Sequence, residues 1–126
     1  MEFHNPENFE SLILNCLNKE QFEVIPGYFS ETMESFSKNK KIGLIHCDVD
    51  LYSSTIDCLQ PLFKNGCITE GAMILFDDWN CSRANPDHGQ RKAFSDLCSE
   101  FDIVFSNEGS YSYHGHSFII HSYNTQ

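Results

Sequence analysis

The stretch IHCDVDLYSST at residues 45–55, together with AMILFDDW at residues 72–79, decides the fold of this chain. Each segment begins as a short apolar run and ends abruptly in aspartates. Buried parallel strands are apolar in this way, and ligands bind at their carboxyl ends. If the two strands are neighbours, four carboxylates converge at one edge of the sheet: Asp48, Asp50, Asp77 and Asp78.

The composition is typical of one soluble domain. The chain has 126 residues, of which 40% are hydrophobic and 21% are charged. A formal net charge of −10 and few, scattered basic residues argue against a nucleic-acid partner. No apolar run approaches the roughly 20 residues of a membrane span, and no signal peptide is recognisable at the start. The six cysteines show no C-x-x-C pair, so we expect free thiols and a cytoplasmic location without membrane contact.

Periodicity along the chain alternates between helix and strand. Apolar residues at helical spacing predict helices around residues 9–17, after Ser54 and from about Gln90. The helix after Ser54 is expected to open on a capping box with Asp57 and to end at residues 65–66, Asn-Gly. Short apolar runs predict strands at residues 22–26, 42–47, 72–76, 102–106 and 117–121.

This alternation predicts an α/β fold with a mainly parallel sheet. The last two predicted strands are separated by only about ten residues, too few for a helical crossover, so we expect them to pair as an antiparallel hairpin. The whole chain, residues 1–126, is expected to be one domain unit.

The four aspartates predict a divalent-cation site. Adjacent strands lie about 4.8 Å apart, so carboxylates from both tips can reach one ion. Without a cation the like charges raise one another's pKa. Ligation by oxygen alone favours Mg²⁺, Mn²⁺ or Ca²⁺ over zinc. The alternative interpretation is that these residues are helix caps and solvated loop ends, where aspartate is common for turn reasons.

Two other metal-site motifs resemble the DVD segment at residues 48–50. The D-x-D motif of nucleotide-sugar glycosyltransferases holds a metal on a diphosphate, but it leaves the second aspartate pair unexplained. The D-x-D-x-T motif of haloacid-dehalogenase-like phosphatases fits poorly, because Tyr52 stands at the threonine position.

A longer combination of motifs covers both aspartate pairs. IPGYFSETM at residues 25–33, IHCDVDLYSST, MILFDDW at residues 73–79 and GQRKAF at residues 89–94 together resemble the macrocin O-methyltransferase (TylF/MycF/NovP-type) family. These proteins are class I S-adenosylmethionine-dependent methyltransferases. The resemblance implies a partial Rossmann-like methyltransferase sheet, mostly parallel, with a carboxyl-terminal antiparallel hairpin and helices on both faces.

The resemblance also implies roles for individual residues. Asp50, Asp77 and Asp78 correspond to ligands of Mg²⁺ or Mn²⁺, and Asp50 also to the catalytic proton acceptor. Residues implied to lie near the S-adenosylmethionine cofactor are Asp48, at the tip of the strand that meets it, and Gly27 and Tyr28. His88 and Trp79 are the implied contacts of the acceptor, a sugar or other small molecule with a hydroxyl group.

The resemblance covers only the carboxyl half of such an enzyme. A glycine-rich loop of the form G-x-G-x-x-G, which would cradle the cofactor, is not found in the sequence. We therefore expect weak or absent binding of S-adenosylmethionine by these residues alone, and a homo-oligomer or a second chain that supplies the amino-terminal half. The rival hypothesis is a non-catalytic, truncated relative.

Overall fold

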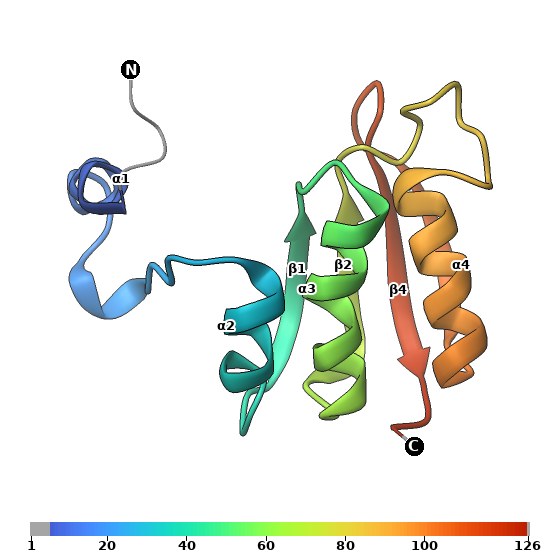
Figure 1. Ribbon diagram of the computed structural model, residues 1–126, viewed down its shortest axis with the longest axis horizontal. Coiled ribbons are helices and arrows are strands. Elements are labelled where there is room, and N and C mark those ends of the chain that lie inside the picture. The colour runs from blue at the N-terminus through green and yellow to red at the C-terminus, as the bar shows by residue number, and fades with distance from the viewer. Residues whose placement is uncertain (1–5, 126) are drawn as a thin grey trace.

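A computed structural model describes residues 6–125 of the protein (Figure 1). Helices and strands alternate through most of the chain. In order they are α1 (Pro6–Leu14), the 3₁₀ helix η1 (Lys19–Gln21), α2 (Phe29–Phe36), β1 (Ile42–Cys47), α3 (Tyr52–Lys64), β2 (Ile68–Phe76), α4 (Gly89–Phe101), β3 (Val104–Ser110) and β4 (His116–Ser122). The α/β class predicted from the sequence is confirmed.

The four strands form one mixed sheet in the order β1-β2-β4-β3. β1 and β2 are parallel neighbours, with Cys47 opposite Phe76, so their carboxyl ends lie side by side as predicted. β4 pairs antiparallel with both β2 and β3, which confirms the terminal hairpin. The prediction of a mostly parallel sheet is corrected, because the hairpin inserts its second strand beside β2 and leaves a single parallel pair.

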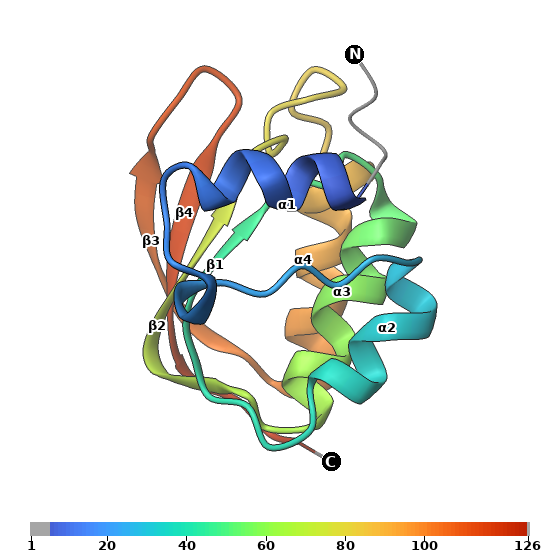
Figure 2. The same cartoon turned by 90° about the vertical axis from the view of Figure 1, so that its left-hand side faces the viewer.

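The helices α2, α3 and α4 lie side by side on one face of the sheet (Figure 1, Figure 2). Strand alternation explains this arrangement, because Cys47, Ile74, Phe76, Phe118 and Ile120 point toward these helices and are buried. Helices were expected on both faces, but none of the described helices covers the opposite face. α1 lies beyond the β1 edge, at the far end of the molecule from β3 (Figure 1).

Aromatic side chains fill the core between the sheet and the helices. The ring of Phe63 on α3 packs 5.7 Å from Phe101 on α4 and 5.0 Å from Tyr123 after β4. Near the carboxyl ends of β1 and β2, Phe76 contacts Phe94 at 5.1 Å. These contacts fix α3 and α4 against the sheet and so hold the strand tips in place.

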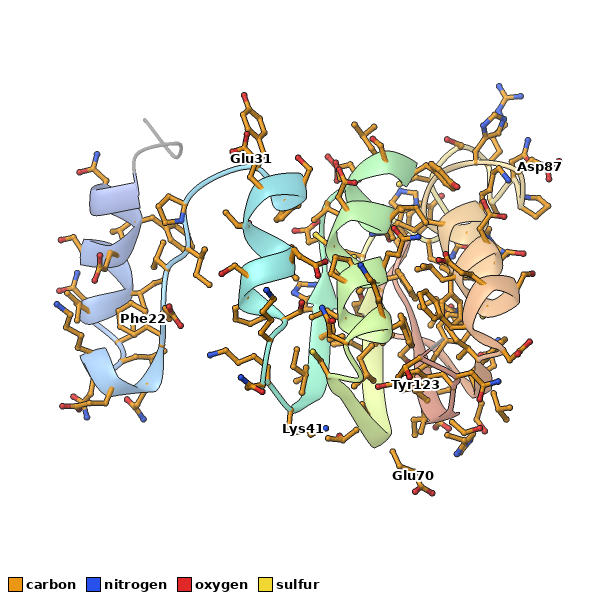
Figure 3. The ribbon with its side chains drawn as sticks, turned by 60° about the horizontal axis from the view of Figure 1, so that its bottom comes forward. Phe22, Glu31, Lys41, Glu70, Asp87 and Tyr123 are labelled. Atoms are coloured by element: carbon orange, nitrogen blue, oxygen red, sulfur yellow. The ribbon has the colours of Figure 1, made fainter. Side chains whose placement is uncertain are left out.

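Two predicted local features are absent from the described residues. Residues 22–26 were expected to form a strand, but they run as unpaired coil between η1 and α2, because no described strand lies beside them. Figure 3 shows Phe22 on the α1 side of this linker. The capping box of Ser54 and Asp57 does not form, because α3 already begins at Tyr52, with Leu51 as N-cap.

The predicted end of that helix at Asn65 and Gly66 is confirmed. The Cys67 amide donates to the Leu62 carbonyl at 2.9 Å, and the Gly66 amide donates to the Phe63 carbonyl at 3.1 Å. This pair of bonds is a Schellman motif, which needs a residue with positive φ. Gly66 has φ +66° and supplies it.

None of the helices within residues 6–125 is both long enough and apolar enough to cross a membrane.

Candidate functional site

The tips of β1 and β2 bring three of the predicted aspartates together. Asp48 and Asp50 follow β1, and Asp78 follows β2. Each offers one carboxylate oxygen, and these three oxygens lie within 4.8 Å of one another. Asp48 and Asp50 are exposed, while Asp78 is partly buried. The group therefore opens to solvent and presents oxygen ligands of the kind that Mg²⁺ and Mn²⁺ prefer.

A tight turn sets the direction of Asp50. The Leu51 amide donates to the Val49 carbonyl at 2.6 Å, which closes a three-residue turn around Asp50. Asp50 has φ +60°, a left-handed backbone conformation that non-glycine residues rarely adopt. The Asp50 amide donates to Asp78 Oδ2 at 3.2 Å and so ties the two strand tips together. A strained residue held in this way is characteristic of functional sites.

Gln90, on the first turn of α4, binds the backbone beside the acidic group. Its side chain is 1% exposed. Gln90 Nε2 donates to the Cys47 carbonyl at 2.9 Å, and Gln90 Oε1 accepts from the Asp78 amide at 2.9 Å. One buried side chain therefore connects the end of β1 to the end of β2, because it satisfies a backbone group on each.

Asp77 has hydrogen-bond partners of its own beside the group formed by Asp48, Asp50 and Asp78. Its Oδ1 atom lies 3.2 Å from Nε2 of His46, and it accepts a hydrogen bond from the Tyr111 hydroxyl at 3.0 Å. Asp77 and Asp78 are consecutive residues at the end of β2, and successive side chains along an extended chain point in opposite directions. The structure thus groups Asp48 with Asp50 and Asp78, whereas the family resemblance implied Asp77 as the third metal ligand.

The neighbouring carboxylates Asp77 and Asp78 have pKa values shifted in opposite directions. The hydrogen bonds from His46 and Tyr111 lower the pKa of Asp77, because they stabilise its charged form. Partial burial and the nearby Asp50 carboxyl raise the pKa of Asp78, because both disfavour its charge. A raised pKa in a crowded carboxylate group is the state that a bound cation would relieve.

The two predicted acceptor contacts occupy different environments. Trp79 belongs to an aromatic cluster, with its ring 4.8 Å from Phe118 and 5.1 Å from Phe76. The Arg91 guanidinium stacks on Trp79 at 5.1 Å and donates through Nε to the Trp79 carbonyl at 3.1 Å. Trp79 thus covers the end of the sheet. His88 is exposed at the N-cap of α4, in the loop beside the site.

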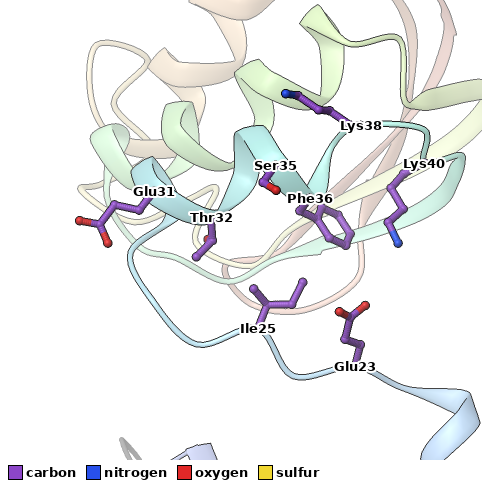
Figure 4. Close-up of a pocket in the computed structure, with 8 residues that line it drawn as sticks. All are labelled: Glu23, Ile25, Glu31, Thr32, Ser35, Phe36, Lys38 and Lys40. Carbon is purple, nitrogen blue, oxygen red and sulfur yellow. The ribbon is translucent and has the colours of Figure 1, made fainter.

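The predicted cofactor contacts Gly27 and Tyr28 lie where the linker enters α2, outside the acidic group. Gly27 has φ +131°, and the side chain of Tyr28 is 77% exposed. A cavity of about 450 Å³ separates this linker from α2. Figure 4 shows Ile25 of the linker facing Thr32 and Phe36 of α2 across it. Within residues 6–125, no hydrogen bond or ring contact joins Gly27 or Tyr28 to Asp48, so their roles at the cofactor remain predictions.

A second, apolar groove leads from α2 to the acidic group. It has a volume of about 440 Å³ and runs between α2, β1 and α3. Met33, Phe36, Ile45 and Leu62 contribute apolar walls, and Asp48 lies at its end. The acidic group therefore borders a hydrophobic hollow on one side and solvent on the other.

Sequence reasoning missed the supporting residues Gln90 and Tyr111. A signal for Gln90 was present, because it is a polar residue on the apolar face of its predicted helix, next to Ala93 and Phe94. Tyr111 gave no such signal. It lies in the loop between β3 and β4, and its contact with Asp77 arises only from the pairing of β4 with β2.

Three comparisons with known proteins bear on this site. The family model described as macrocin-O-methyltransferase (TylF) matches residues 5–103. The chain is 31% identical over 86 residues to an 8-demethyl-8-(2,3-dimethoxy-alpha-L-rhamnosyl)-tetracenomycin-C 4'-O-methyltransferase of Streptomyces olivaceus. That match covers 66% of this chain and 32% of the relative.

The fold is similar to a solved structure of the O-methyltransferase NovP. The TM-score is 0.71 at 22% sequence identity, and the match covers 93% of this chain and 43% of that chain. The chain therefore spans about a third of the length of the Streptomyces relative and less than half of NovP.

Proposed function

Because the chain belongs to the macrocin-O-methyltransferase (TylF) family, we propose that it carries the metal and acceptor part of an S-adenosylmethionine-dependent O-methyltransferase. The acceptor is a hydroxyl group of a sugar or another small molecule. The observation that carries the proposal is the convergence of Asp48, Asp50 and Asp78 within 4.8 Å at the strand tips. A glycosyltransferase D-x-D site is not favoured, since the matches on both sides of that motif are to methyltransferases.

The residues present fit a divalent cation. Three carboxylate oxygens from two strands form a hard, all-oxygen donor set. Partial burial, and next the nearby Asp50 carboxyl, raise the pKa of Asp78, and a bound cation would offset both effects. Asp50 and Asp78 would hold the ion, with Asp48 as the third oxygen donor. Asp77 lies directly before Asp78, and its Oδ1 atom is the one that contacts His46 and Tyr111. When bound, the cation lowers the pKa of a substrate hydroxyl.

Asp50 is the proposed proton acceptor. Its carboxylate is exposed at the mouth of the site, and its backbone is fixed by the turn and by the bond to Asp78. A substrate hydroxyl within hydrogen-bond distance transfers its proton to a carboxylate oxygen of Asp50. S-adenosylmethionine, when bound, would supply the methyl group from its sulfonium and leave as S-adenosylhomocysteine. The fixed backbone of Asp50 contributes by alignment of the proton acceptor with the hydroxyl.

Manganese binding followed by electron paramagnetic resonance tests the cation site. We expect the wild-type chain to bind Mn²⁺ saturably and Mg²⁺ to compete. Asp78→Asn should weaken binding about tenfold or more, because it removes a charged ligand. The matched control is Asp57→Asn, on the exposed side of α3, which should bind as the wild type does. Equal Mn²⁺ affinities for the two variants would show that Asp78 does not bind the cation.

Calorimetry tests the expected role of S-adenosylmethionine. The 126 residues alone should bind it weakly or not at all, since they span less than half of the solved relative. A micromolar affinity of the isolated chain would contradict this. In a protein that performs methyl transfer, replacement of Asp77 and Asp78 by asparagine should abolish Mg²⁺-dependent activity. Activity that survives would mean that the assignment of these aspartates as metal ligands is wrong.

A further inference from the structure

The loop between β3 and β4 reaches the tips of β1 and β2 (Figure 1, Figure 2). It comprises residues 111–115, between the end of β3 and the start of β4. The Tyr111 hydroxyl donates to Asp77 Oδ1 at 3.0 Å, and the His114 carbonyl accepts from the Asn80 amide at 3.0 Å. The loop therefore contacts the segment that follows β2 at two separate points.

Asp77 lies beside Asp48 at the edge of the acidic group. The last pair in the parallel register is Cys47 opposite Phe76, so the next residues along the two strands are Asp48 and Asp77. The Asp77 amide donates to the Cys47 carbonyl at 3.1 Å, which continues the pairing by one step. His46 alternates with the buried Cys47, and its Nε2 atom lies 3.2 Å from Asp77 Oδ1. The Asp77 carboxylate therefore lies on the sheet face away from the helices.

Two side chains from different strands hold a single oxygen of Asp77. Tyr111 approaches Oδ1 from the β3–β4 loop, and His46 approaches the same atom from β1. Since a carboxylate oxygen only accepts, Nε2 of His46 carries the proton in this contact. A carboxylate that is bound by two donors keeps one direction, and in metal sites such outer partners orient the carboxylates that act on the ion.

Gly115 makes room for the Tyr111 ring. Gly115 is buried, and a Cβ atom built on it would lie 2.5 Å from Tyr111 Cζ and 2.7 Å from Cε2. Carbon atoms that are not bonded to each other keep a separation of about 3.5–4.0 Å, so a side chain at this position would displace the ring. The Tyr111 hydroxyl is bonded to Cζ. A residue without a side chain at position 115 is therefore what allows this hydroxyl to reach Asp77.

The loop keeps its place without the Tyr111 hydroxyl. β3 and β4 pair as far as Ser110 opposite His116, directly beside the loop. The His114 carbonyl joins the loop to the segment after β2 independently. Tyr111 is also 42% exposed, so its ring is not part of the core. The hydroxyl is therefore not needed to build the hairpin, and its consequence lies at the carboxylate that it holds.

We propose that Tyr111 is a positioning residue for the cation site, which holds Asp77 Oδ1 so that this carboxylate keeps one fixed direction beside Asp48. The inference rests on the proposed function, since it requires that a divalent cation binds at these strand tips. The family model matches residues 5–103, so Tyr111 lies outside the matched segment. When the ion is bound, the fixed carboxylate places a negative charge where it favours the cation.

Manganese binding by the 126-residue chain, followed by electron paramagnetic resonance, tests this role. Tyr111→Phe keeps the ring and removes only the hydroxyl, and it should weaken Mn²⁺ binding about tenfold, as the loss of an outer partner does in other metal sites. Tyr113→Phe is the matched control. Tyr113 lies in the same loop, is 89% exposed, and its hydroxyl makes no hydrogen bond within residues 6–125, so the Mn²⁺ affinity should not change. Thermal unfolding of both variants should stay close to that of the wild type.

Gly115→Ala tests the same contact without a change to the tyrosine. The added methyl group displaces the Tyr111 ring, so this variant should weaken Mn²⁺ binding to a similar degree as Tyr111→Phe. Ser112 Oγ also lies 2.5 Å from the added atom, but it ends a flexible side chain that can rotate away. Gly43→Ala is the control, because nothing lies within 4 Å of a Cβ atom added there.

A double-mutant cycle shows whether Tyr111 acts through Asp77. In the Asp77→Ala background, Tyr111→Phe should cause no further loss of Mn²⁺ affinity, because the oxygen that the hydroxyl holds is gone. If the two losses add, Tyr111 acts on the ion by another route and the proposal is wrong.

A measurement without metal reports the hydrogen bond itself. In carboxyl ¹³C NMR of the chain in EDTA, the Asp77 signal is assigned by its absence in Asp77→Ala. This signal should shift in Tyr111→Phe and stay in place in Tyr113→Phe. An Asp77 signal that is unchanged in Tyr111→Phe would overturn the inference.

The outcomes separate this inference from the proposed function. Equal Mn²⁺ affinities of Tyr111→Phe and the wild type, together with weakened binding by Asp78→Asn, would overturn the inference and leave the cation site in place. If the wild type binds no Mn²⁺, the cation site and the role of Tyr111 are both wrong.

Discussion

Two regions of the molecule bury their apolar residues very differently. From Cys47 onward, side chains such as Phe63, Ile74 and Phe76 are fully buried. Between residues 8 and 46, no hydrophobic residue is buried, and several large ones are exposed. The second group includes Phe9 at 48% and Leu12 at 56% exposure on α1.

The difference shows that amphipathic pattern and packing are separate properties. α1 and α4 both place apolar residues at helical spacing, but only α4 has a sheet to cover. Most helix stability in proteins comes from tertiary packing, so α1 lacks the contacts that stabilise α4. The packed region, residues 47–125, holds the buried core, and the open region, residues 8–46, adds only partly buried residues such as Met33 and Ile45 to it.

The largest expected effect is a loss of folding stability from a substitution in the packed region. Phe63→Ala should lower the free energy of unfolding by about 3–5 kcal/mol, because it leaves a cavity beside Phe101 and Tyr123. Its matched partner in the open region, Phe9→Ala, should change it by less than about 0.5 kcal/mol. Urea denaturation measures both. Similar losses for the two variants would show that α1 packs on the core.

The next effect concerns polar contacts inside the packed region. Gln90→Ala removes partners from the Asp78 amide and the Cys47 carbonyl, so we expect a loss of about 2 kcal/mol. Gln60→Ala is the control, because Gln60 bonds only to Glu100 on the surface and should cost less than about 0.5 kcal/mol. A negligible loss at Gln90 would mean that water replaces its two hydrogen bonds.

The packed region is also where sequence reasoning succeeded. The strands β1 and β2, the end of α3 at Gly66 and the terminal hairpin follow from local apolar runs and turn residues. In the open region, the predicted strand at residues 22–26 is not formed. A strand needs a neighbour to pair with, and local pattern carries no information about whether that neighbour is present.

The candidate site shows the same limit at atomic scale. Strand tips and adjacency were enough to predict that Asp50 and Asp78 meet. The sequence predicted that all four aspartates converge, but which oxygens group together depends on side-chain direction. His46 and Tyr111 contact Asp77 Oδ1, and Tyr111 comes from a hairpin loop distant in the sequence.

A pair of glycines compares the backbone of the two regions. Gly66, in the packed region, has φ +66°, so Gly66→Ala should cost about 1 kcal/mol through backbone strain. Gly43, in the open region, has no positive φ and nothing within 4 Å of an added Cβ. Gly43→Ala should be neutral or slightly stabilising, because it restricts the unfolded chain. Thermal unfolding of the two variants measures the difference, and a loss at Gly43 would show that this edge is already packed.

The smallest effect lies at the boundary between the regions, where the acidic group begins, and it depends on pH. The folded-state pKa of Asp78 is raised, so its contribution to stability is present below the unfolded value of about 3.9 and is lost as pH rises through the folded value. In EDTA, Asp78→Asn should therefore become more stable than the wild type as pH increases above that value. Asp77 has a lowered pKa, and its contribution is present above the ordinary carboxyl value and is lost as pH falls.

Asp77→Asn should accordingly be less stable than the wild type at neutral pH, and the gap should close in acid. The two neighbouring variants thus predict pH slopes of opposite sign, which chemical denaturation between acidic and neutral pH can resolve. Added Mg²⁺ should abolish the advantage of Asp78→Asn, because a bound cation stabilises the charged carboxylate that asparagine lacks. Slopes of the same sign would mean that Asp77 turns toward the other three carboxylates in solution, as the family resemblance implies for a metal ligand.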